Sequence, residues 1–166
     1  MYVRAAVLLL AGMLLVWWYL EWYGGPDVVA RVLFSETASC TRHERLLVAG
    51  VMRNRVGNAA FGDLPSVKAV VLQAGAFSCI NDDGNGNWRK SRHPGSMSAG
   101  ERAVWENCLE IANGTMAPAM GPSGRPLVYY HDHSIGKPRS WDNAKWHAVR
   151  EVVTEHFVFY SIVPAD

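Results

Sequence analysis

The chain of 166 residues begins with a long uncharged segment, which limits how everything after it can fold. Residues 5–20 contain no Asp, Glu, Lys or Arg, and the 19 residues from 5 to 23 carry one charge, on Glu21. A helix needs roughly 20 mainly apolar residues to cross a bilayer, and a charge near its end can snorkel to the interface. We therefore expect a transmembrane or signal-anchor helix over residues 1–23, followed by one domain over residues 24–166.

The flanks of this segment favour a retained anchor. It ends in aromatic side chains, which are typical of a membrane interface: Trp17, Trp18, Tyr19, Trp22 and Tyr23. A cleaved signal peptide is the alternative, but such a peptide should end in a small-residue cleavage site. Arg4 and the chain amine precede the segment, which favours a cytoplasmic N-terminus and places residues 24–166 on the far side of the membrane.

The composition is that of an ordinary globular domain. Apolar residues make up 49% of the chain and charged residues 19%, which is enough apolar material for a core. Sixteen Lys and Arg against fifteen Asp and Glu give a formal charge of +1, so no broad basic field exists to bind a nucleic acid. Three cysteines without a C-x-x-C spacing define neither a zinc site nor a disulfide framework. The sequence predicts no nucleic-acid partner, and it does not decide the oligomeric state.

Helix signals fill the first two thirds of the domain. A first helix is expected from Asp27, as its cap, to about Ala38. Thr41 and Glu44 form a capping box that opens a second helix running towards Val56. Ser98 and Glu101 form another capping box, and the helix that they open ends at Asn113-Gly114.

Strand signals are concentrated in the last third. Two runs rich in aromatic and β-branched residues, 127–130 and 157–160, predict strands. Residues 67–73 fit either a short helix or a strand, and residues 81–95 predict a polar, glycine-rich loop. The fold class that follows is α+β: a mainly helical domain beside a small antiparallel sheet.

One acidic residue lies on the apolar stripe of the first predicted helix. At helical spacing Glu36 shares this stripe with Val29, Val32 and Leu33. Burial of a carboxylate against apolar walls raises its pKa, which is what a general acid needs near neutral pH. The alternatives are that the helix is rotated so that Glu36 lies at the rim, or that Glu36 pairs with Arg53 or Arg55.

Several motifs together resemble one protein family. The segment 30–38, ARVLFSETA, is followed without gaps by a helix that ends in Asn54-Arg55-Val56. This order resembles the spore cortex-lytic SleB-type cell wall hydrolases, which have an A-R-x-x-Y-A-E-A segment and a helix ending N-R-V. Residues 73–79 are similar to the family's Q-x-x-x-F-S-C segment, Tyr130-His131 to its Y-H element, and residues 156–160 to its terminal N-H-V-F-Y.

The chain departs from the family pattern at three places. Phe34-Ser35 stands where Tyr-Ala is usual, Ser39-Cys40-Thr41 replaces a G-E-P segment, and Phe157 takes the place of the terminal His. None of these departures affects the glutamate. They concern the details of substrate binding and leave the reaction type untouched.

The resemblance implies a lysozyme-like fold that acts on peptidoglycan, with Glu36 as the acid and base of a lytic transglycosylase and no cofactor. The enzyme would cleave the glycan strand between N-acetylmuramic acid and N-acetylglucosamine. Protonated Glu36 would donate to the bridging oxygen, and the resulting carboxylate would take the proton of the muramoyl 6-hydroxyl as this closes on the anomeric carbon. Such a domain would lie in the periplasm, anchored in a bacterial inner membrane.

Other reactions of the same kind of site stay open. Hydrolysis with two carboxylates is one of them, and its candidates for the second acid are Asp82, Asp83, Asp132 and Asp142. The side chains expected to contact the sugar combine flat apolar faces with polar edges. They lie in or near the matched motifs: Phe77, Ser78, Tyr130, His131 and Trp141.

Two metal readings of the sequence fail. Asn81, Asp83 and Asn85 match positions of a calcium loop, but its last ligand position holds Arg92 in place of Glu. His131-x-His133 could join His93, His147 or His156 in a zinc site, yet no established ligand spacing supports it. We therefore expect no metal.

Three further possibilities concern the function of the whole chain. A cell-wall peptidase would use Cys79 with His131, and a membrane-tethered binding module would keep the fold without turnover. The short anchor before a single wall-degrading domain also resembles phage endolysins of the signal-anchor-release type, in which the helix first holds the enzyme inactive at the membrane. The expected partners are peptidoglycan strands and the membrane.

Overall fold

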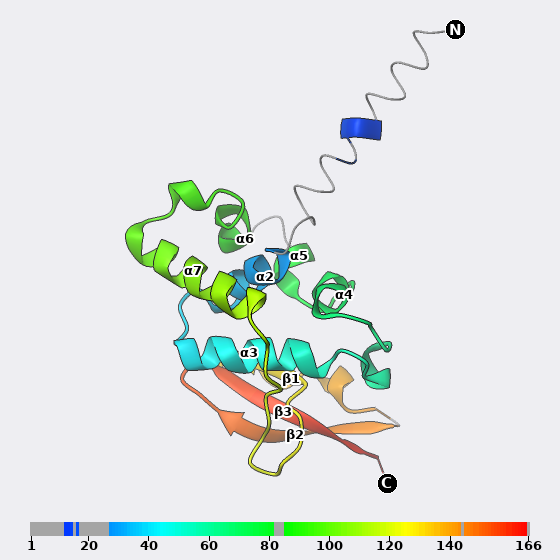
Figure 1. The fold of residues 1–166 in the computed structure, drawn as a ribbon. Coiled ribbons are helices and arrows are strands. Elements are labelled where there is room, and N and C mark those ends of the chain that lie inside the picture. The colour runs from blue at the N-terminus through cyan, green and yellow to red at the C-terminus, as the bar shows by residue number, and fades with distance from the viewer. Residues whose placement is uncertain (1–11, 15, 17–26, 82–84, 144, 166) are drawn as a thin grey trace, which may run out of the picture.

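A computed structural model describes residues 12–14, 16, 27–81, 85–143 and 145–165. The predicted anchor over residues 1–23 lies outside this part of the chain, apart from residues 12–14 and 16. Among the described residues, no helix has both the length and the apolar character that a bilayer crossing demands. The domain is of the predicted α+β class, with its helices on one side and a small antiparallel sheet on the other (Figure 1).

Helix α2 (Val28–Thr37) is the centre of the helical part. Almost its whole surface is buried, and it packs against α3 to α7 (Figure 1). Asp27 stands at the N-cap position as predicted, but its side chain makes no capping hydrogen bond. Since α2 is enclosed by other helices, its residues are held in fixed positions up to its last turn, where Glu36 lies.

The two predicted capping boxes are both present. Helix α3 (Arg42–Asn54) opens where the Thr41 hydroxyl accepts a hydrogen bond from the Glu44 amide, with the Glu44 carboxylate accepting from the Thr41 amide in return. Helix α7 (Ala99–Asn113) opens in the same way at Ser98 and Glu101. Each box satisfies two amides that the first helical turn would otherwise leave unpaired.

Residues 67–72 form helix α4, which decides between helix and strand for this segment. The Ser66 hydroxyl caps it by accepting from the Ala69 amide at 3.1 Å. The short helix α5 (Ser78–Asn81) follows, and single 3₁₀ turns complete the irregular parts: Ala59–Phe61, Pro94–Ser96 and Arg139–Trp141.

The prediction of a plain loop over residues 81–95 is wrong. Helix α6 (Gly86–Lys90) lies in this segment, and the Asn85 side chain caps it by accepting from the Trp88 amide at 2.8 Å. Trp88 is fully buried and stacks under the guanidinium of Arg31, 4.2 Å from the ring centroid. The packing of Trp88 against Arg31 of α2 thus outweighs the weak helix propensity of the surrounding glycines and asparagines.

The sheet consists of β1 (Tyr129–Asp132), β2 (Trp146–Val153) and β3 (Phe157–Pro164), with β3 in the middle. All pairing is antiparallel, and a bulge interrupts β2 between Arg150 and Val152. The first predicted strand lies two residues later than expected, and β2 was missed. Helix α3 lies between the other helices and the sheet (Figure 1).

A long irregular connection leads from α7 to β1, and α3 holds it in place. Gly50 allows the chain to pass close by, since a Cβ there would lie 2.5 Å from the Cβ of Ala119. The Asn54 amide donates to the carbonyls of Ala119 and Leu127 at 2.7 and 2.8 Å. These contacts fix the starting point of β1 next to the end of α3.

Candidate functional site

A cleft of about 610 Å³ lies between the end of α2, the segment that connects α4 to α5, and strand β1. Residues from distant parts of the sequence meet in it. All six side chains for which the sequence predicts a role line this cleft: Glu36, Phe77, Ser78, Tyr130, His131 and Trp141.

Glu36 is half-buried in the last turn of α2 and faces the cleft. Its Oε2 accepts a hydrogen bond from the Tyr130 hydroxyl at 3.2 Å. Its Oε1 is buried and, within the described part of the chain, has no conventional hydrogen-bond partner. No described Lys or Arg forms an ion pair with it, so the alternative of a structural pair with Arg53 or Arg55 is not realised.

Tyr130 acts as the hydrogen-bond donor in this contact. Burial raises the pKa of Tyr130 well above its ordinary value, and the neighbouring Glu36 carboxylate raises it further. The phenol therefore keeps its proton across the pH range in which proteins function, and it can donate to Glu36 throughout. The Tyr130 ring packs edge-on against Phe157, 5.2 Å between centroids, which fixes the hydroxyl in position.

Arg55 is a cleft residue that the sequence suggested only as an ion-pair alternative. Its Nε donates to the Val128 carbonyl at 2.8 Å, and its guanidinium carbon lies 4.9 Å from the Phe61 ring centroid and 5.5 Å from that of Phe77. Burial lowers the pKa of Arg55, but an arginine remains charged under such conditions. The Glu36 carboxylate is among the nearby charges that favour this cation.

The motif Asn54-Arg55 therefore has a physical reason in this chain. Asn54 holds the connection that leads to β1, and Arg55 binds the residue directly before that strand. Together they place Tyr130 opposite Glu36. Two neighbouring residues at the end of α3 thus organise one wall of the cleft and supply its buried positive charge.

The other wall is aromatic. Tyr129 and Trp141 are stacked, with ring centroids 4.4 Å apart and an angle of 12° between the planes. Tyr160 meets Trp141 edge-on at 5.5 Å. Flat apolar faces of this kind suit the apolar face of a sugar ring, whereas the polar groups along the cleft suit its hydroxyls.

His131 lines the cleft, but both of its ring nitrogens are already engaged. Nδ1 lies 2.7 Å from the Asp132 carbonyl, and Nε2 lies 3.0 Å from the Tyr160 hydroxyl. Since a carbonyl can only accept, we assign the proton to Nδ1, so that Nε2 accepts from Tyr160. This arrangement favours a role in holding the aromatic wall over a direct polar contact with a ligand.

Comparison with known proteins now gives the family. The model of the Cell Wall Hydrolase family matches residues 41–160, which is most of the chain. The chain belongs to the Cell Wall Hydrolase family. No curated protein and no solved structure gives a significant match. The family places this chain among enzymes that degrade peptidoglycan, and the matched range contains every predicted site residue except Glu36, which precedes its start by five positions.

For a Cell Wall Hydrolase, a second carboxylate in the cleft would matter. Asp132 lines the cleft, and its hydrogen bonds with Ser134 lower the pKa of its carboxyl. Asp142 lies outside the cleft lining and is held by Lys137, which lowers its pKa. Asp82 and Asp83 lie outside the described residues. Asp132 is thus the described candidate that reaches the cleft.

The geometry of a thiol peptidase is not formed in this Cell Wall Hydrolase. Cys79 is fully buried, and burial, together with the neighbouring Glu36, raises the pKa of its thiol. The nitrogens of His131 face Asp132 and Tyr160 instead of the thiol. A buried thiol that stays protonated and has no histidine nitrogen facing it is a poor nucleophile.

The zinc set considered for the histidines is not assembled either. Among the described residues, the group of side chains close enough to hold a metal ion contains neither His131 nor His133. It consists of Cys40, Glu44 and His156 and lies outside the cleft. The calcium loop considered for residues 81–92 falls partly outside the described residues.

Proposed function

We propose that this Cell Wall Hydrolase cleaves the peptidoglycan glycan strand between N-acetylmuramic acid and N-acetylglucosamine as a lytic transglycosylase. The observation that carries the proposal is the position of Glu36 and the hydrogen bonding of its two oxygens. This carboxyl faces a cleft, one of its oxygens is held by Tyr130, and the other is buried without a conventional partner among the described residues. A group placed in this way is oriented yet still able to exchange a proton with a ligand.

The reaction needs one group that gives a proton and then takes one. Protonated Glu36 donates its proton to the glycosidic oxygen as the bond from this oxygen to the muramoyl anomeric carbon breaks. The 6-hydroxyl oxygen of the same muramoyl residue then bonds to that carbon, and its proton passes to Glu36. Glu36 is thereby restored, and the products are a 1,6-anhydro end and a free 4-hydroxyl, with no water consumed.

The neighbours of Glu36 support both of its protonation states. The Tyr130 hydroxyl donates to the carboxylate that remains after the first proton transfer. The buried charge of Arg55, which lines the same cleft, stabilises the negative charge at that moment. Neither residue exchanges a proton in this scheme. They position and stabilise the group that does.

The substrate fits the two walls of the cleft. The stacked pair Tyr129 and Trp141 offers a platform for a sugar ring, and Phe77 and Ser78 line the same cleft as Glu36. A helix that presents a glutamate towards a small antiparallel sheet is also what the proposed lysozyme-like fold would provide. We assign the glycan contacts to these side chains, with His131 holding the wall.

The proposed location follows from the N-terminal segment. A helix over residues 1–23 would anchor the chain in a bacterial inner membrane and leave the catalytic domain, residues 24–166, in the periplasm, where peptidoglycan lies. Release of such an anchor would turn the chain into an endolysin of the signal-anchor-release type. Recovery of the protein only in the membrane fraction after depolarisation would argue against release.

The products decide the reaction. Full-length chain in mild detergent is incubated with purified sacculi, and the soluble muropeptides are analysed by mass spectrometry. Anhydro ends in the wild type and in Glu106→Gln, an exposed control, with none in Glu36→Gln, are the expected result. Reducing ends would point to hydrolysis with Asp132 as the second acid. Cleaved stem peptides, or binding without soluble products, would overturn the proposal.

A further inference from the structure

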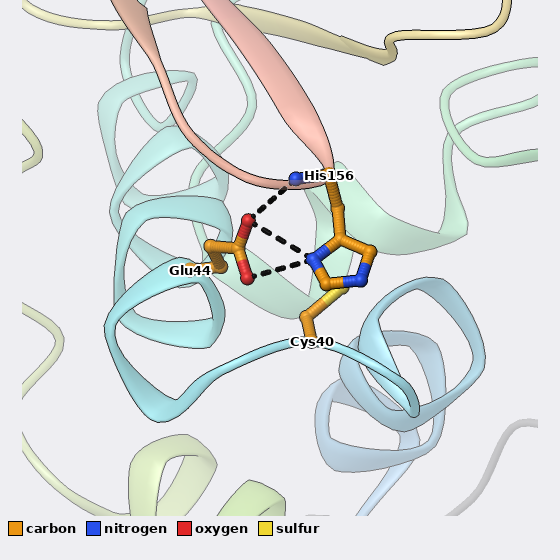
Figure 2. Close-up of side chains that lie close together, drawn as sticks. All are labelled: Cys40, Glu44 and His156. Carbon is orange, nitrogen blue, oxygen red and sulfur yellow. Dashed lines mark hydrogen bonds and ion pairs between the residues drawn. The ribbon is translucent and has the colours of Figure 1, made fainter.

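A second cluster of reactive side chains lies away from the cleft. It consists of Cys40, in the turn between α2 and α3, Glu44, in the first turn of α3, and His156, in the turn between β2 and β3 (Figure 2). The sulfur, a carboxylate oxygen and a ring nitrogen all lie within 4.8 Å of one another. None of the three residues lines the cleft, so the proposed reaction leaves the cluster unexplained.

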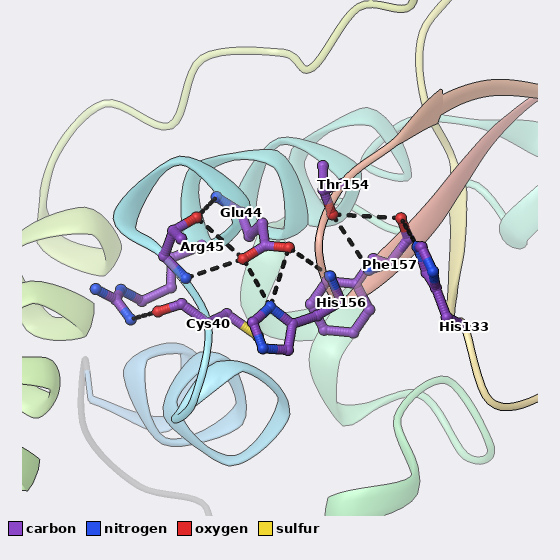
Figure 3. A network of polar contacts seen from close by, with 8 residues as sticks. Cys40, Glu44, Arg45, His133, Thr154, His156 and Phe157 are labelled. Carbon is purple, nitrogen blue, oxygen red and sulfur yellow. Dashed lines mark hydrogen bonds and ion pairs between the residues drawn. The ribbon is translucent and has the colours of Figure 1, made fainter.

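Glu44 organises the cluster. It is 1% exposed, and its oxygens accept from the amides of Thr41 and His156, each at 2.9 Å. Figure 3 shows the contact with His156. The His156 Nδ1 lies 3.1 Å from Oε2. Burial acts to raise the pKa of Glu44, but its hydrogen bonds, first among them that of Thr154, outweigh burial and lower it to about 2. The carboxylate is therefore charged and fixed in place.

We propose that Cys40, Glu44 and His156 bind a divalent transition-metal ion, with Zn²⁺ as the ion that best fits their chemistry. A thiolate, an imidazole nitrogen and a carboxylate oxygen are all ligands of zinc. Calcium and magnesium prefer oxygen ligands alone, so a set with sulfur and nitrogen selects against them. The buried, charged carboxylate gives the site an anionic ligand that is already in place.

The geometry is close to what such an ion needs. Ligand atoms in a tetrahedral zinc site lie about 3.5 Å apart, given metal–ligand distances of about 2.0–2.3 Å. The distance of 3.1 Å between His156 Nδ1 and Glu44 Oε2 is already within this value. The Cys40 sulfur lies within 4.8 Å of the other two ligand atoms, so it has to move closer by at most about 1.3 Å. The His156 side chain is 29% exposed, which leaves the outer side open for water as a fourth ligand.

The supporting contacts hold two of the ligands. The Cys40 carbonyl accepts from the Arg45 Nη1 at 2.6 Å, and the Thr41 amide and hydroxyl both bind the Glu44 carboxylate. Contacts of this kind orient the ligands of metal sites and raise their affinity. The site would join the start of α3 to the turn between β2 and β3, so bound metal would stabilise the fold.

Metal binding here has to displace protons. A cysteine thiol ordinarily carries its proton near neutral pH, whereas zinc is bound by the thiolate. Nδ1 of His156 faces an acceptor oxygen, and a proton between them would also have to leave. The metal ion replaces these protons between the side chains of Cys40, Glu44 and His156, which already lie close together. Binding therefore releases at least one proton per ion.

The spacing along the chain gave no sign of this site. Cys40 and Glu44 are four residues apart, but His156 follows Glu44 by 112 residues and reaches the cluster only through the fold. The expectation that no metal binds rested on local ligand spacing. A search for ligands at short spacing along the chain does not find a site that combines the start of a helix with a distant turn.

Cobalt(II) provides the direct test, because a thiolate bound to Co²⁺ gives a charge-transfer absorption in the near ultraviolet. Full-length chain in mild detergent is stripped with a chelator and titrated with Co²⁺, then with Zn²⁺. We expect one equivalent to produce the band, Zn²⁺ to abolish it, and calorimetry in buffers of different ionisation enthalpy to show proton release.

The variants separate this site from its surroundings. Cys40→Ser should lose the band, whereas Cys108→Ser, which changes another buried cysteine, and Glu36→Gln should keep it. His156→Gln gives a second route should Cys40→Ser fail to fold. Absence of a band in the wild type, or a band that survives in Cys40→Ser or His156→Gln, would overturn the proposal. Because Glu36→Gln keeps the metal, this result is independent of the proposed reaction.

Discussion

Glu36 and Glu44 are eight residues apart in the sequence, and the fold treats them in opposite ways. Glu44 is buried and accepts hydrogen bonds from the amides of Thr41 and His156 and from the Thr41 hydroxyl. Glu36 is half-buried, accepts one hydrogen bond from Tyr130, and keeps its other oxygen without a conventional partner in the described part of the chain. The first carboxylate is fixed by several donors, whereas the second is held by Tyr130 on one oxygen.

This difference separates a structural acid from a reactive one. A carboxylate surrounded by donors is locked in its charged form, so it stabilises the fold and transfers no proton. A carboxylate that lines a cleft and is surrounded by few donors can bind a proton and pass it to a ligand. The number of donors around each glutamate is thus a better guide to its role than its burial, because Glu44 is the more deeply buried of the two.

The largest effect is expected from Glu36→Gln. Loss of a general acid and base lowers rates by roughly a hundredfold to ten-thousandfold. We expect the release of muropeptides to fall by about a thousandfold. The free energy of unfolding, measured with urea, should change by less than about 1 kcal/mol, since the amide oxygen of Gln can still accept the hydrogen bond from Tyr130. Activity above a tenth of the wild-type rate would contradict the assignment of Glu36.

The same substitution at Glu44 should have the reverse effect. Glu44→Gln removes the charge that the amides of Thr41 and His156 and the Thr154 hydroxyl stabilise. We expect the free energy of unfolding to fall by about 3 kcal/mol, measured with urea and a chelator present. Activity per folded molecule should stay within about twofold. Glu106→Gln on the exposed face of α7 is the matched control and should leave both quantities unchanged.

The stabilisation of the fold by the Glu44 carboxylate should also be visible in the pH dependence of the unfolding free energy. The pKa of Glu44 is lowered from 4.5 to about 2 in the folded state, so the carboxylate stabilises the fold fully above the unfolded value. This contribution is lost as the pH falls from about 4.5 towards about 2, and it amounts to about 3 kcal/mol. Unfolding free energies measured across this range should drop less steeply in Glu44→Gln. Equal slopes in the two proteins would contradict the lowered pKa.

Patterns within a few residues of one another correctly predicted features that depend on neighbouring residues. The capping boxes at Thr41 and Ser98 depend on residues three positions apart, and both are present in the fold. The position of Glu36 follows from the helical period, which the neighbouring turns of one helix determine. Four of the other predicted cleft residues came from motifs along the chain and Trp141 from a position near them, and all six line the cleft.

Features that depend on distant residues were not predicted. Helix α6 was taken for a loop because its stability comes from Trp88 packing under Arg31 on α2. Strand β2 was missed because a bulge after Arg150 breaks its alternation. Arg55 was considered only as a partner of Glu36, whereas its partners are the Val128 carbonyl and three aromatic rings. The pairing of Glu44 with His156 spans 112 residues and leaves no local trace.

The smallest effect is expected from Tyr130→Phe, which removes the hydrogen bond from the Tyr130 hydroxyl to Glu36. A hydrogen bond to a charged group contributes about 1.5 kcal/mol, which corresponds to about a tenfold change in rate. We expect the turnover number to fall by about that factor, whereas sacculus binding stays the same, since the ring remains packed against Phe157. Mass spectrometry of muropeptides over time gives the rate, and a pull-down with sacculi gives the binding.

Tyr160→Phe makes the Tyr130 result specific. It removes a buried hydroxyl that lies next to the cleft residue His131, and that hydroxyl bonds to His131 and not to Glu36. If the contact with Glu36 sets the reaction rate, Tyr130→Phe should slow turnover several times more than Tyr160→Phe does. Equal losses would mean that any disturbance of the wall slows the enzyme, and that Glu36 reacts without being held. The contrast between a saturated and a singly held glutamate would then lose its mechanistic meaning.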